Sequence, residues 1–595
     1  MKNKITLLTI GGIIFSYLFY EQHLGINALL FSISLITFMA MQYPDFLKNK
    51  YAPFCAAGAL IAGFFIYWNN STVSYYAYFI SLFGLIAFKN EGSFTLLNYA
   101  LTYVINLICM PLAFFNTVHN NEHEINNEPA TVEHNASDRF KKIIGYLIVV
   151  IIIIIFFFIY QTANPLFYQF TKNLSLFNIN YGFIFFCILG MVLLFPLFYN
   201  TIIKTFFNLE AEQNTIINPE NFTTALIEKH KLHTIFFLFI ALNIMLVVIN
   251  LLDINYLYLS HTMPKGITQA QFVHNGVGTL IFSIVLGASI ICFLFKGDLN
   301  FIKENKTIKL LVYAWILQNI FMVISTMLRN NIYVFNSGLT GKRIGVYYYL
   351  FFTIIGLLFT AYKIYKHKTV YFLYATNTWI WYGVLLLSCS VNWENIIFKN
   401  QLQKYNANKI LDFEYATRFN KTNLSELITL FNVGKNENID YKNPNNIYSV
   451  CRDYVDLKKK VESNLIEFLL YKENTGWQSY NKMNQTTYSQ ILKLNQKQQF
   501  DRITLQYGVS EISKNPIKAI SCLSSLKTLI IYDNQVDLKN LYLLYNVEKV
   551  IWFGRDVNSI KYFKTMKNLK VLEIPHIVEP YDDYFENLLP NVNVI

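Results

Sequence analysis

Two arginines bracket a short segment whose residue types could hold an anion. Arg329 and Arg343 stand near its ends, with Tyr333, Gly338 and Thr340 between them. A guanidinium group can bond the freed carbonyls of a helix end, contact a lipid phosphate, or bind an anionic ligand. We expect these five residues to form a structured loop at the membrane interface, and we favour the bonding of carbonyls over the other two roles.

Ligand-type side chains also gather in the polar segment 116–142. They are His119, Glu122, His123, Glu124, Glu128, Glu133 and His134. A structural metal site needs three or four ligands in fixed geometry. The Asn, Pro and Ala residues around these side chains are instead typical of a flexible linker. The seven cysteines are scattered without a CxxC pair or metal-ligand spacing. We therefore predict no metal and no cofactor.

The common catalytic and nucleotide-binding motifs are missing from this sequence. It contains no GxGxxG, P-loop, GxSxG or HExxH pattern. An NTPase, a nucleotide-binding dehydrogenase and a familiar hydrolase therefore lack support. The sequence favours a protein that is not an enzyme. A membrane enzyme for lipid-linked substrates, with Arg329 and Arg343 holding phosphate, stays open as the third choice.

The first two thirds of the chain consist of long apolar runs. Overall, 54% of residues are hydrophobic and only 14% are charged. A helix needs about 20 apolar residues to cross a bilayer, and the chain has about a dozen such runs. They cover residues 5–20, 24–41, 52–68, 73–88, 94–115, 143–160, 181–199, 234–252, 276–295, 308–328, 344–362 and 370–391. We predict a polytopic all-α membrane bundle.

Charged residues are almost absent from the middle of these runs. Asp253, His261, His274 and Arg329 stand at span ends, where long side chains reach the interface. This argues against an ion-coupled transporter, because such proteins keep ionisable groups at membrane depth. Gln318 and Asn319 form the best polar pair within a span, and we expect them to hydrogen-bond between helices. A transporter or channel remains the main alternative function.

The loop charges predict an orientation. The loops before residues 143, 234, 308 and 370 each carry three or four Lys or Arg residues, and the loops between them carry one to three. The richer loops are cytoplasmic by the positive-inside rule, which puts the chain after residue 391 outside the cytoplasm. The early spans disagree: with Lys2, Lys4 and Lys48 inside, five spans would put segment 116–142 outside.

The chain changes character after residue 393. Residues 456–471 place apolar side chains at helical spacing, which predicts an amphipathic helix. Leu526, Leu529, Ile531 and Asn534 then fit the LxxLxLxxN strand of a leucine-rich repeat. Related apolar frames start at residues 500, 547, 569 and 589, so that the five starts, with Leu526 as the second, are 26, 21, 22 and 20 residues apart. An ordinary α/β domain with alternating strands is the alternative to these leucine-rich-repeat-like units.

Repeats of this kind stack into an extended face that suits a partner. Residues between the apolar strand positions are expected to point outward. They are Lys527, Thr528, Ile530, Glu548, Lys549, Ile551, Lys570 and Glu573. We predict three parts: a transmembrane domain over 1–393, a mainly helical segment over 394–498, and a small soluble α/β repeat domain over 499–595.

The segment from Arg329 to Ile344 reads R…IY…GLT..RI. This pattern resembles the signature of a bacterial family of multi-spanning membrane proteins known only as a domain of unknown function. Segments 268–276, 392–396, 411–415 and 476–481 resemble further elements of that family, so the resemblance covers roughly residues 140–490. The sequence departs from the pattern at Gly276-Val277, where the family has Gly-Phe. The resemblance implies a membrane fold joined to the segment that follows it, and implies no activity.

The sequence therefore predicts a multi-pass protein of the bacterial cytoplasmic membrane whose activity is unassigned. Its net charge of +12 lies largely in loops beside the spans, and without a basic stripe or recognition motif we predict no nucleic-acid binding. The expected partners are membrane lipids and a protein that docks on the C-terminal repeats. The leading hypothesis is envelope sensing or scaffolding, with the C-terminal domain outside the cytoplasm.

Overall fold

A computed structural model describes most of the chain. The described residues are 2–48, 51–87, 181–198, 215–217, 229–255, 269–296, 298–301, 305–408, 423–433, 447–505, 516–532, 536–554, 556–575 and 588–595, with isolated positions in 95–107 and 156–167. The chain divides into two compact units. The first comprises residues 1–20, 31–56 and 80–212, and the second comprises 21–30, 57–79 and 213–595.

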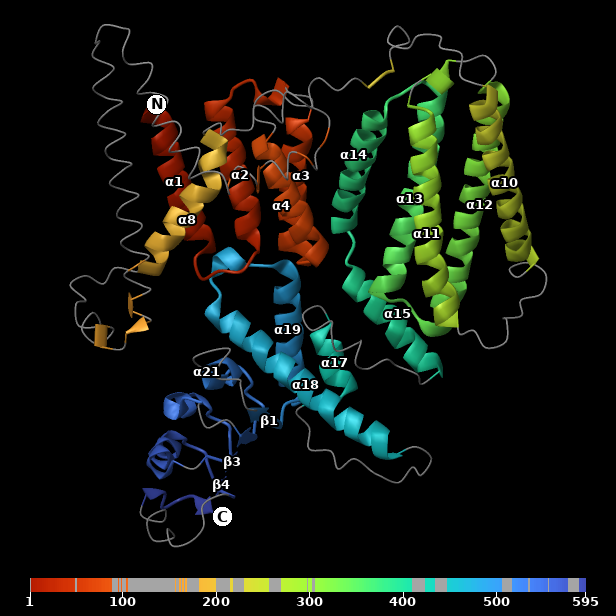
Figure 1. The fold of residues 1–595 in the computed structure, drawn as a ribbon. Helices are drawn as coiled ribbons and strands as arrows, with labels where there is room; N and C mark the ends of the chain where they lie inside the picture. The colour runs from red at the N-terminus through yellow and green to blue at the C-terminus, as the bar shows by residue number, and fades with distance from the viewer. Residues whose placement is uncertain are drawn as a thin grey trace, which may run out of the picture. The chain divides into compact units, whose positions relative to one another are not determined.

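Apolar helices make up the N-terminal third of the described chain (Figure 1). They are α1 (Lys2–Phe19), α2 (Ile26–Gln42), α3 (Ala52–Asn69), α4 (Thr72–Ala87) and α8 (Tyr181–Phe198). In the first unit α1 runs antiparallel to α8. The Ser16 hydroxyl donates to the Phe183 carbonyl at 2.9 Å, and Gly11 leaves room for the Leu194 side chain. Small residues let the two backbones approach, as is common between membrane helices.

The second unit contributes a further set of long helices. They are α10 (Lys229–Ile254), α11 (Gln269–Leu294), α12 (Lys306–Ser337), α13 (Gly341–Tyr365) and α14 (Val370–Cys389). Five of the described helices, α3, α10, α12, α13 and α14, are long and apolar enough to cross a bilayer, and five shorter apolar helices accompany them. The predicted runs at 94–115 and 143–160 lie outside the described residues except for isolated positions, so a count of about a dozen spans stays a prediction.

Two of these helices, α10 and α12, run parallel in a fixed register. Asn243 donates to the Leu311 carbonyl at 3.0 Å, and Asn250 donates to the Gln318 carbonyl at 3.2 Å. Both pairs are separated by 68 residues, so the two bonds repeat after seven residues on each helix. Gln318 also donates from its side chain to Asn243 at 2.7 Å. The expectation that Gln318 bonds between helices is confirmed, whereas Asn319 donates to Trp315 within its own helix.

Helices continue beyond the last apolar run. They are α15 (Trp393–Asn408), α17 (Leu424–Leu430), α18 (Ile447–Asn474), the 3-10 turn η7 (Trp477–Ser479) and α19 (Lys482–Gln496). The amphipathic helix predicted over 456–471 lies within α18, whose inner face buries Val461, Leu465 and Leu469.

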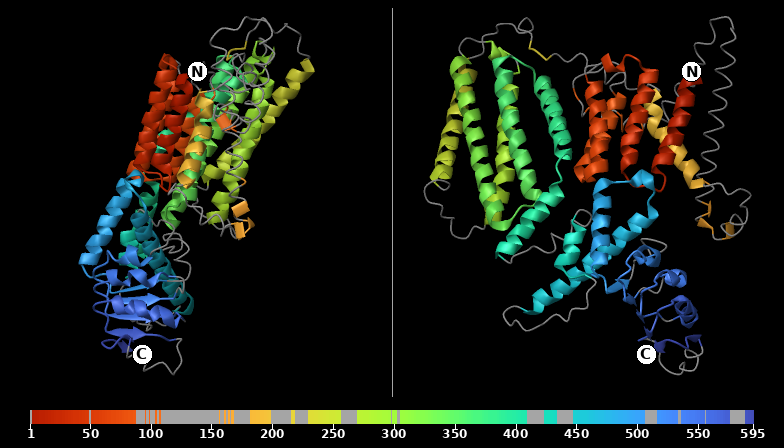
Figure 2. Two further views of the ribbon diagram at one scale, coloured as in Figure 1. Left: turned by 90° about the vertical axis from the view of Figure 1, so that its left-hand side faces the viewer. Right: turned by 180° about the vertical axis from the view of Figure 1, so that it is seen from behind.

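The chain ends in a small parallel sheet (Figure 2). Its strands are β1 (Arg502–Leu505), β2 (Thr528–Ile531), β3 (Lys549–Trp552), β4 (Val571–Glu573) and β5 (Asn593–Val594), and they follow one another in chain order. The elements between them are α21 (Pro516–Ile520), η8 (Leu538–Leu543) and η9 (Val557–Thr565).

The predicted apolar frames coincide with these strands, with one difference at the last. Ile503, Leu529, Val550 and Leu572 lie opposite one another as predicted. In the fifth frame Val594, and not Val592, pairs with Leu572. The frame is therefore wrong by two residues, a shift that leaves the same face inward because side chains alternate along a strand.

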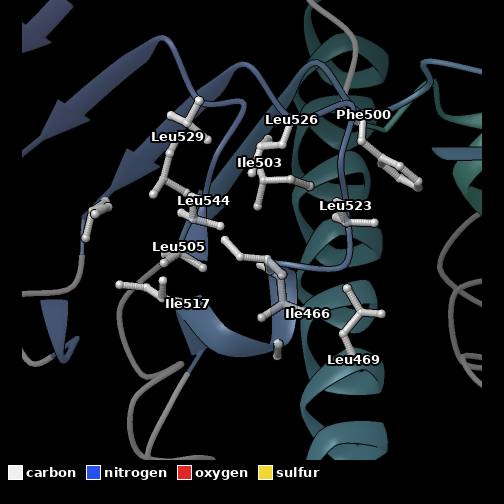
Figure 3. Packing of buried hydrophobic residues seen from close by; sticks show 14 of the residues in the cluster. Ile466, Leu469, Phe500, Ile503, Leu505, Ile517, Leu523, Leu526, Leu529 and Leu544 are labelled. Carbon is white, nitrogen blue, oxygen red and sulfur yellow. The ribbon is translucent and has the colours of Figure 1, made fainter. Parts of the chain in front are cut away.

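The apolar core of the C-terminal region combines helices and sheet. One cluster of buried side chains runs from Phe398 to Leu589. Figure 3 shows Ile466 and Leu469 of α18 beside Ile503 and Leu505 of β1. Because this core crosses the boundary predicted at residue 498, the strands bury their apolar face partly against the helices that precede them. The division into separate domains stays a prediction.

Candidate functional site

Of the five residues predicted to form an interfacial loop, Arg329 and Tyr333 lie within α12 and Arg343 lies in the first turn of α13. The prediction of a loop over all five is therefore wrong, and only Gly338 and Thr340 lie in the connection between the two helices. Helix α12 ends at Ser337, and Gly338 follows with φ +80° and ψ 169°, a conformation that is essentially restricted to glycine. A Cβ atom there would also lie 2.7 Å from the Gln401 amide. Thr340 then caps α13 by accepting from the Arg343 amide at 3.3 Å. Local sequence thus explains the sharp turn.

Arg343 closes this turn from inside. Its Nη1 donates to the Ser337 carbonyl at 2.9 Å and also to the Gly338 carbonyl. The guanidinium lies 3.9 Å from the centre of the Tyr333 ring, and the residue is 8% exposed. A cation at the carbonyl end of a helix is favourable because the helix dipole is negative there. Arg343 has the carbonyl-bonding role that we favoured.

Arg329 has a different partner, which sequence reasoning missed. It forms an ion pair with Asp253 at the end of α10, and both side chains are largely buried, at 15% and 11% exposure. The two residues are 76 positions apart, so no local pattern joins them. Arg343 bonds carbonyls and Arg329 bonds a carboxylate. Of the functions considered, a membrane enzyme in which these two arginines hold phosphate therefore has the least support from the geometry.

Two further residues that sequence reasoning missed hold the turn from α15. Asn400 accepts from the Leu339 amide at 2.7 Å, and Gln401 donates to the Leu339 carbonyl at 2.8 Å. Both polar groups of the Leu339 backbone are therefore satisfied where no regular structure could satisfy them. The segment after the last apolar run is thus bonded to the connection between two membrane helices.

Lysines perform the same capping role at the other end of these helices. The Lys363 ammonium is 1% exposed and donates to the Phe295 carbonyl, just after α11, at 3.0 Å. Lys309 donates to the Asn300 carbonyl at 3.0 Å. These bonds satisfy carbonyls that helix ends leave free. These lysines and Arg343 thus bond backbone carbonyls, whereas Arg329 pairs with a carboxylate.

The predicted partner face lies along the strands of the C-terminal sheet. Lys527 and Lys570 are exposed, and Thr528, Glu548, Lys549 and Glu573 are half-buried. Ile530 departs from the expectation, because it is 2% exposed and lies between Thr504 and Ile551 on the neighbouring strands. Burial of an isoleucine side chain is favourable because it removes apolar surface from water. The Ile530 side chain is therefore not accessible to a partner.

A polar hollow opens where the strands begin. It has a volume of about 380 Å³ and is lined by Gln498, Asp501, Ser524, Ser525, Lys527, Asn546, Glu548, Asn568 and Lys570. Asp501, Lys527, Glu548 and Lys570 each directly precede residues paired across the sheet, so they form one row of alternating charge. Lys570 donates to Glu548 at 2.7 Å and holds the pKa of that carboxyl below its usual range.

A buried carboxyl group, which sequence reasoning also missed, accepts a hydrogen bond from the outer edge of the first strand. Glu462 of α18 accepts from the Thr504 amide at 2.6 Å and is 8% exposed. Burial raises the pKa of Glu462 to about 7, against the lowering effects of the Thr504 hydrogen bond and of Arg502 and Lys458. The free edge of β1 is therefore satisfied by a side chain that can change charge near neutral pH.

A metal site among the described residues would need three or four ligating side chains in fixed geometry. No group of three His, Cys, Asp or Glu side chains there has the geometry to hold a metal ion. The ligand-type side chains between His119 and His134 lie outside the described residues, so the prediction made for that segment stays a prediction.

Comparisons with known proteins give one result. A search of curated proteins and a search of solved structures each found no match. A family model described as a domain of unknown function, DUF4153, matches residues 25–430. The match begins earlier and ends earlier than the resemblance we noted over roughly 140–490, and it leaves α18, α19 and the sheet beyond its end. The chain belongs to the DUF4153 family.

Proposed function

We propose that this protein is a multi-pass protein of the cytoplasmic membrane that displays a docking face for a protein partner outside the cytoplasm. The observation that carries the proposal is the row of alternating charges around the polar hollow of the C-terminal sheet. Such a row sets the register of a partner and steers its approach, because only a complementary order of charges avoids repulsion.

The positions of cations along the second unit support this orientation. The starts of α10, α12 and α14 and the ends of α11 and α13 carry Lys229, Lys231, Lys296, Lys306, Lys309, Lys363, Lys366 and Lys368. At the opposite helix ends, Arg329 is ion-paired and Arg343 is buried on carbonyls. The positive-inside rule then favours a cytoplasmic location for the lysine-rich end.

The early helices support the same orientation, although their loop charges conflict at the level of sequence. The Asn69 side chain, at the end of α3, donates to the Cys389 carbonyl at the end of α14 at 3.0 Å. The two helix ends are therefore on one side, and Lys48, which precedes α3, is on the other. Both sets of helices favour a C-terminal region outside the cytoplasm.

Reporter fusions test the orientation. We expect a fusion after Ile595 to report an extracytoplasmic location and a fusion in the α13–α14 turn, at Lys366, to report the cytoplasm. If both fusions report the same compartment, the orientation is refuted, because a single helix, α14, separates the α13–α14 turn from the segment that follows.

Site-specific photo-crosslinking in intact cells tests the docking face. We expect a cross-linker at Lys527 or Lys570 to capture one and the same protein, and a cross-linker at Lys561, on exposed η9, to capture none. Charge reversal at Glu548 should abolish the adduct formed from Lys527. Adducts of equal yield from all three lysines, unaffected by the reversal, would mean that the row does not select a partner.

A channel or transporter is the second candidate, and one observation favours it. Within the described bundle, the side-chain oxygens of Asn250 and Gln318 are buried and accept no hydrogen bond. Water or a permeating solute would satisfy them. A flux across reconstituted membranes that Asn250→Leu lowers, without loss of folded protein, would support this function over docking.

A further inference from the structure

The loop between α18 and α19 is bonded to the start of α2. The Ile26 amide donates to the Tyr480 carbonyl at 3.0 Å, and the His23 amide donates to the Ser479 hydroxyl at 2.9 Å. Gly25 packs so closely that a Cβ atom there would lie 2.6 Å from the Ser479 carbonyl carbon. The two backbone segments are therefore in direct contact, which fixes the position of the loop relative to residues 23–26.

The same loop is bonded to the end of α3. Asn481 donates to the Ile66 carbonyl at 2.6 Å, and the Tyr480 ring stacks on Tyr67 with 5.9 Å between ring centres. The Lys482 ammonium lies 3.1 Å above the centre of the Trp68 ring. Helix α3 is one of the helices able to cross a bilayer, and it ends at Asn69. The loop therefore lies at the level of the C-terminal end of α3.

Large aromatic side chains remain exposed at this level. Trp477 is 54% exposed, Trp68 is 41% exposed and Tyr480 is 39% exposed. Tryptophan and tyrosine collect at the boundary between lipid and water, because their rings are apolar and their N–H or O–H groups are polar. A lysine beside them keeps its charge near lipid phosphate while its stem lies along apolar surface.

We propose that the loop from Gly476 to Lys482 is a membrane-surface element whose binding partner is the headgroup layer of the bilayer that α3 crosses. Trp477 and Tyr480 lie among the glycerol and carbonyl groups, and Lys482 faces phosphate. The C-terminal region then contacts the bilayer surface directly through this loop and is not attached to the membrane only through a flexible linker. This inference does not depend on whether the sheet binds a protein.

Fluorine NMR on the full-length protein in lipid nanodiscs tests the proposal. The protein is labelled with 5-fluorotryptophan, and the resonance of Trp477 is identified by its loss in Trp477→Phe. Gadolinium is supplied on lipid headgroups in one sample and as a soluble chelate in another. We expect headgroup gadolinium to broaden the Trp477 and Trp68 resonances beyond detection. Trp552, 3% exposed in β3, is the internal reference. A Trp477 resonance that only the soluble chelate broadens would overturn the proposal.

A second variant tests what holds the loop in place. Gly25→Ala introduces the clash with Ser479, whereas Gly345→Ala is a matched control because a Cβ atom there has no neighbour within 4 Å. We expect Gly25→Ala to restore a visible Trp477 resonance in the headgroup sample while Trp68 stays broadened. An unchanged Trp477 resonance in that variant would overturn the role assigned to the contact with residues 23–26.

Discussion

The carboxyl group of Glu462 gives the sheet a stability that falls as pH rises. Glu462 lies on α18, and its carboxyl group accepts a hydrogen bond from the Thr504 amide of β1 at 2.6 Å. Burial raises its pKa to about 7 from 4.5. Below pH 4.5 the group is protonated in both the folded and the unfolded chain, so its contribution to stability is complete.

The sign of the effect follows from proton binding. Between pH 4.5 and 7 the folded chain keeps the proton on Glu462 that the unfolded chain has released. Stability therefore decreases across this range and is constant above it. A carboxyl pKa that rises from 4.5 to about 7 corresponds to a loss of about 3 kcal/mol.

Hydrogen exchange of the β1 and β2 amides in the full-length protein measures this loss. Glu462→Gln keeps an oxygen for the Thr504 amide but cannot titrate. Corrected for intrinsic exchange, wild-type protection should fall between pH 5 and 7 relative to that of Glu462→Gln. Glu467→Gln, at an exposed position of the same helix, should behave as wild type. Parallel pH profiles for wild type and Glu462→Gln would refute the reasoning.

Two further substitutions test the connection between α12 and α13, and a third tests the ion pair between α10 and α12, each by the denaturation midpoint in one detergent. Arg343→Ala should cost about 3 kcal/mol, because two carbonyls lose a charged donor, whereas exposed Lys342→Ala should cost almost nothing. Gly338→Ala should cost at least about 2 kcal/mol, because its backbone conformation excludes a side chain. Asp253→Asn should cost about 3 kcal/mol by leaving Arg329 without its counter-charge. Removing both charges should recover part of that loss, and an additive double variant would contradict the pairing.

Helices and strands follow from local sequence in this chain. Ten of the predicted apolar runs are helices, because a long apolar run in lipid can satisfy its backbone polar groups internally only as a helix. The strands that contain Ile503, Leu529, Val550 and Leu572 follow likewise from the apolar frame of Leu526, Leu529 and Ile531 and its recurrence along the chain. The last strand was misplaced by two residues, since Val592 and Val594 fit the pattern equally and only the hydrogen-bond register separates them.

Polar partners far apart in the chain could be predicted only where polar residues recur at a regular interval in the sequence. The seven-residue interval between Asn243 and Asn250 is visible in an otherwise apolar run, and it matches the interval between Leu311 and Gln318. The pair formed by Asp253 and Arg329 leaves no such trace. Ile530 did carry a signal, because an apolar residue at an outward position indicates that something covers it.

The register between α10 and α12 limits how the bundle can move. Sliding one helix along the other by less than two turns would break both asparagine bonds and leave amide groups unbonded away from water. The ion pair between Asp253 and Arg329 adds a third fixed point near one end. We therefore expect α10 and α12 to move as one rigid body. A rearrangement of the second unit would then displace them together relative to α11, α13 and α14.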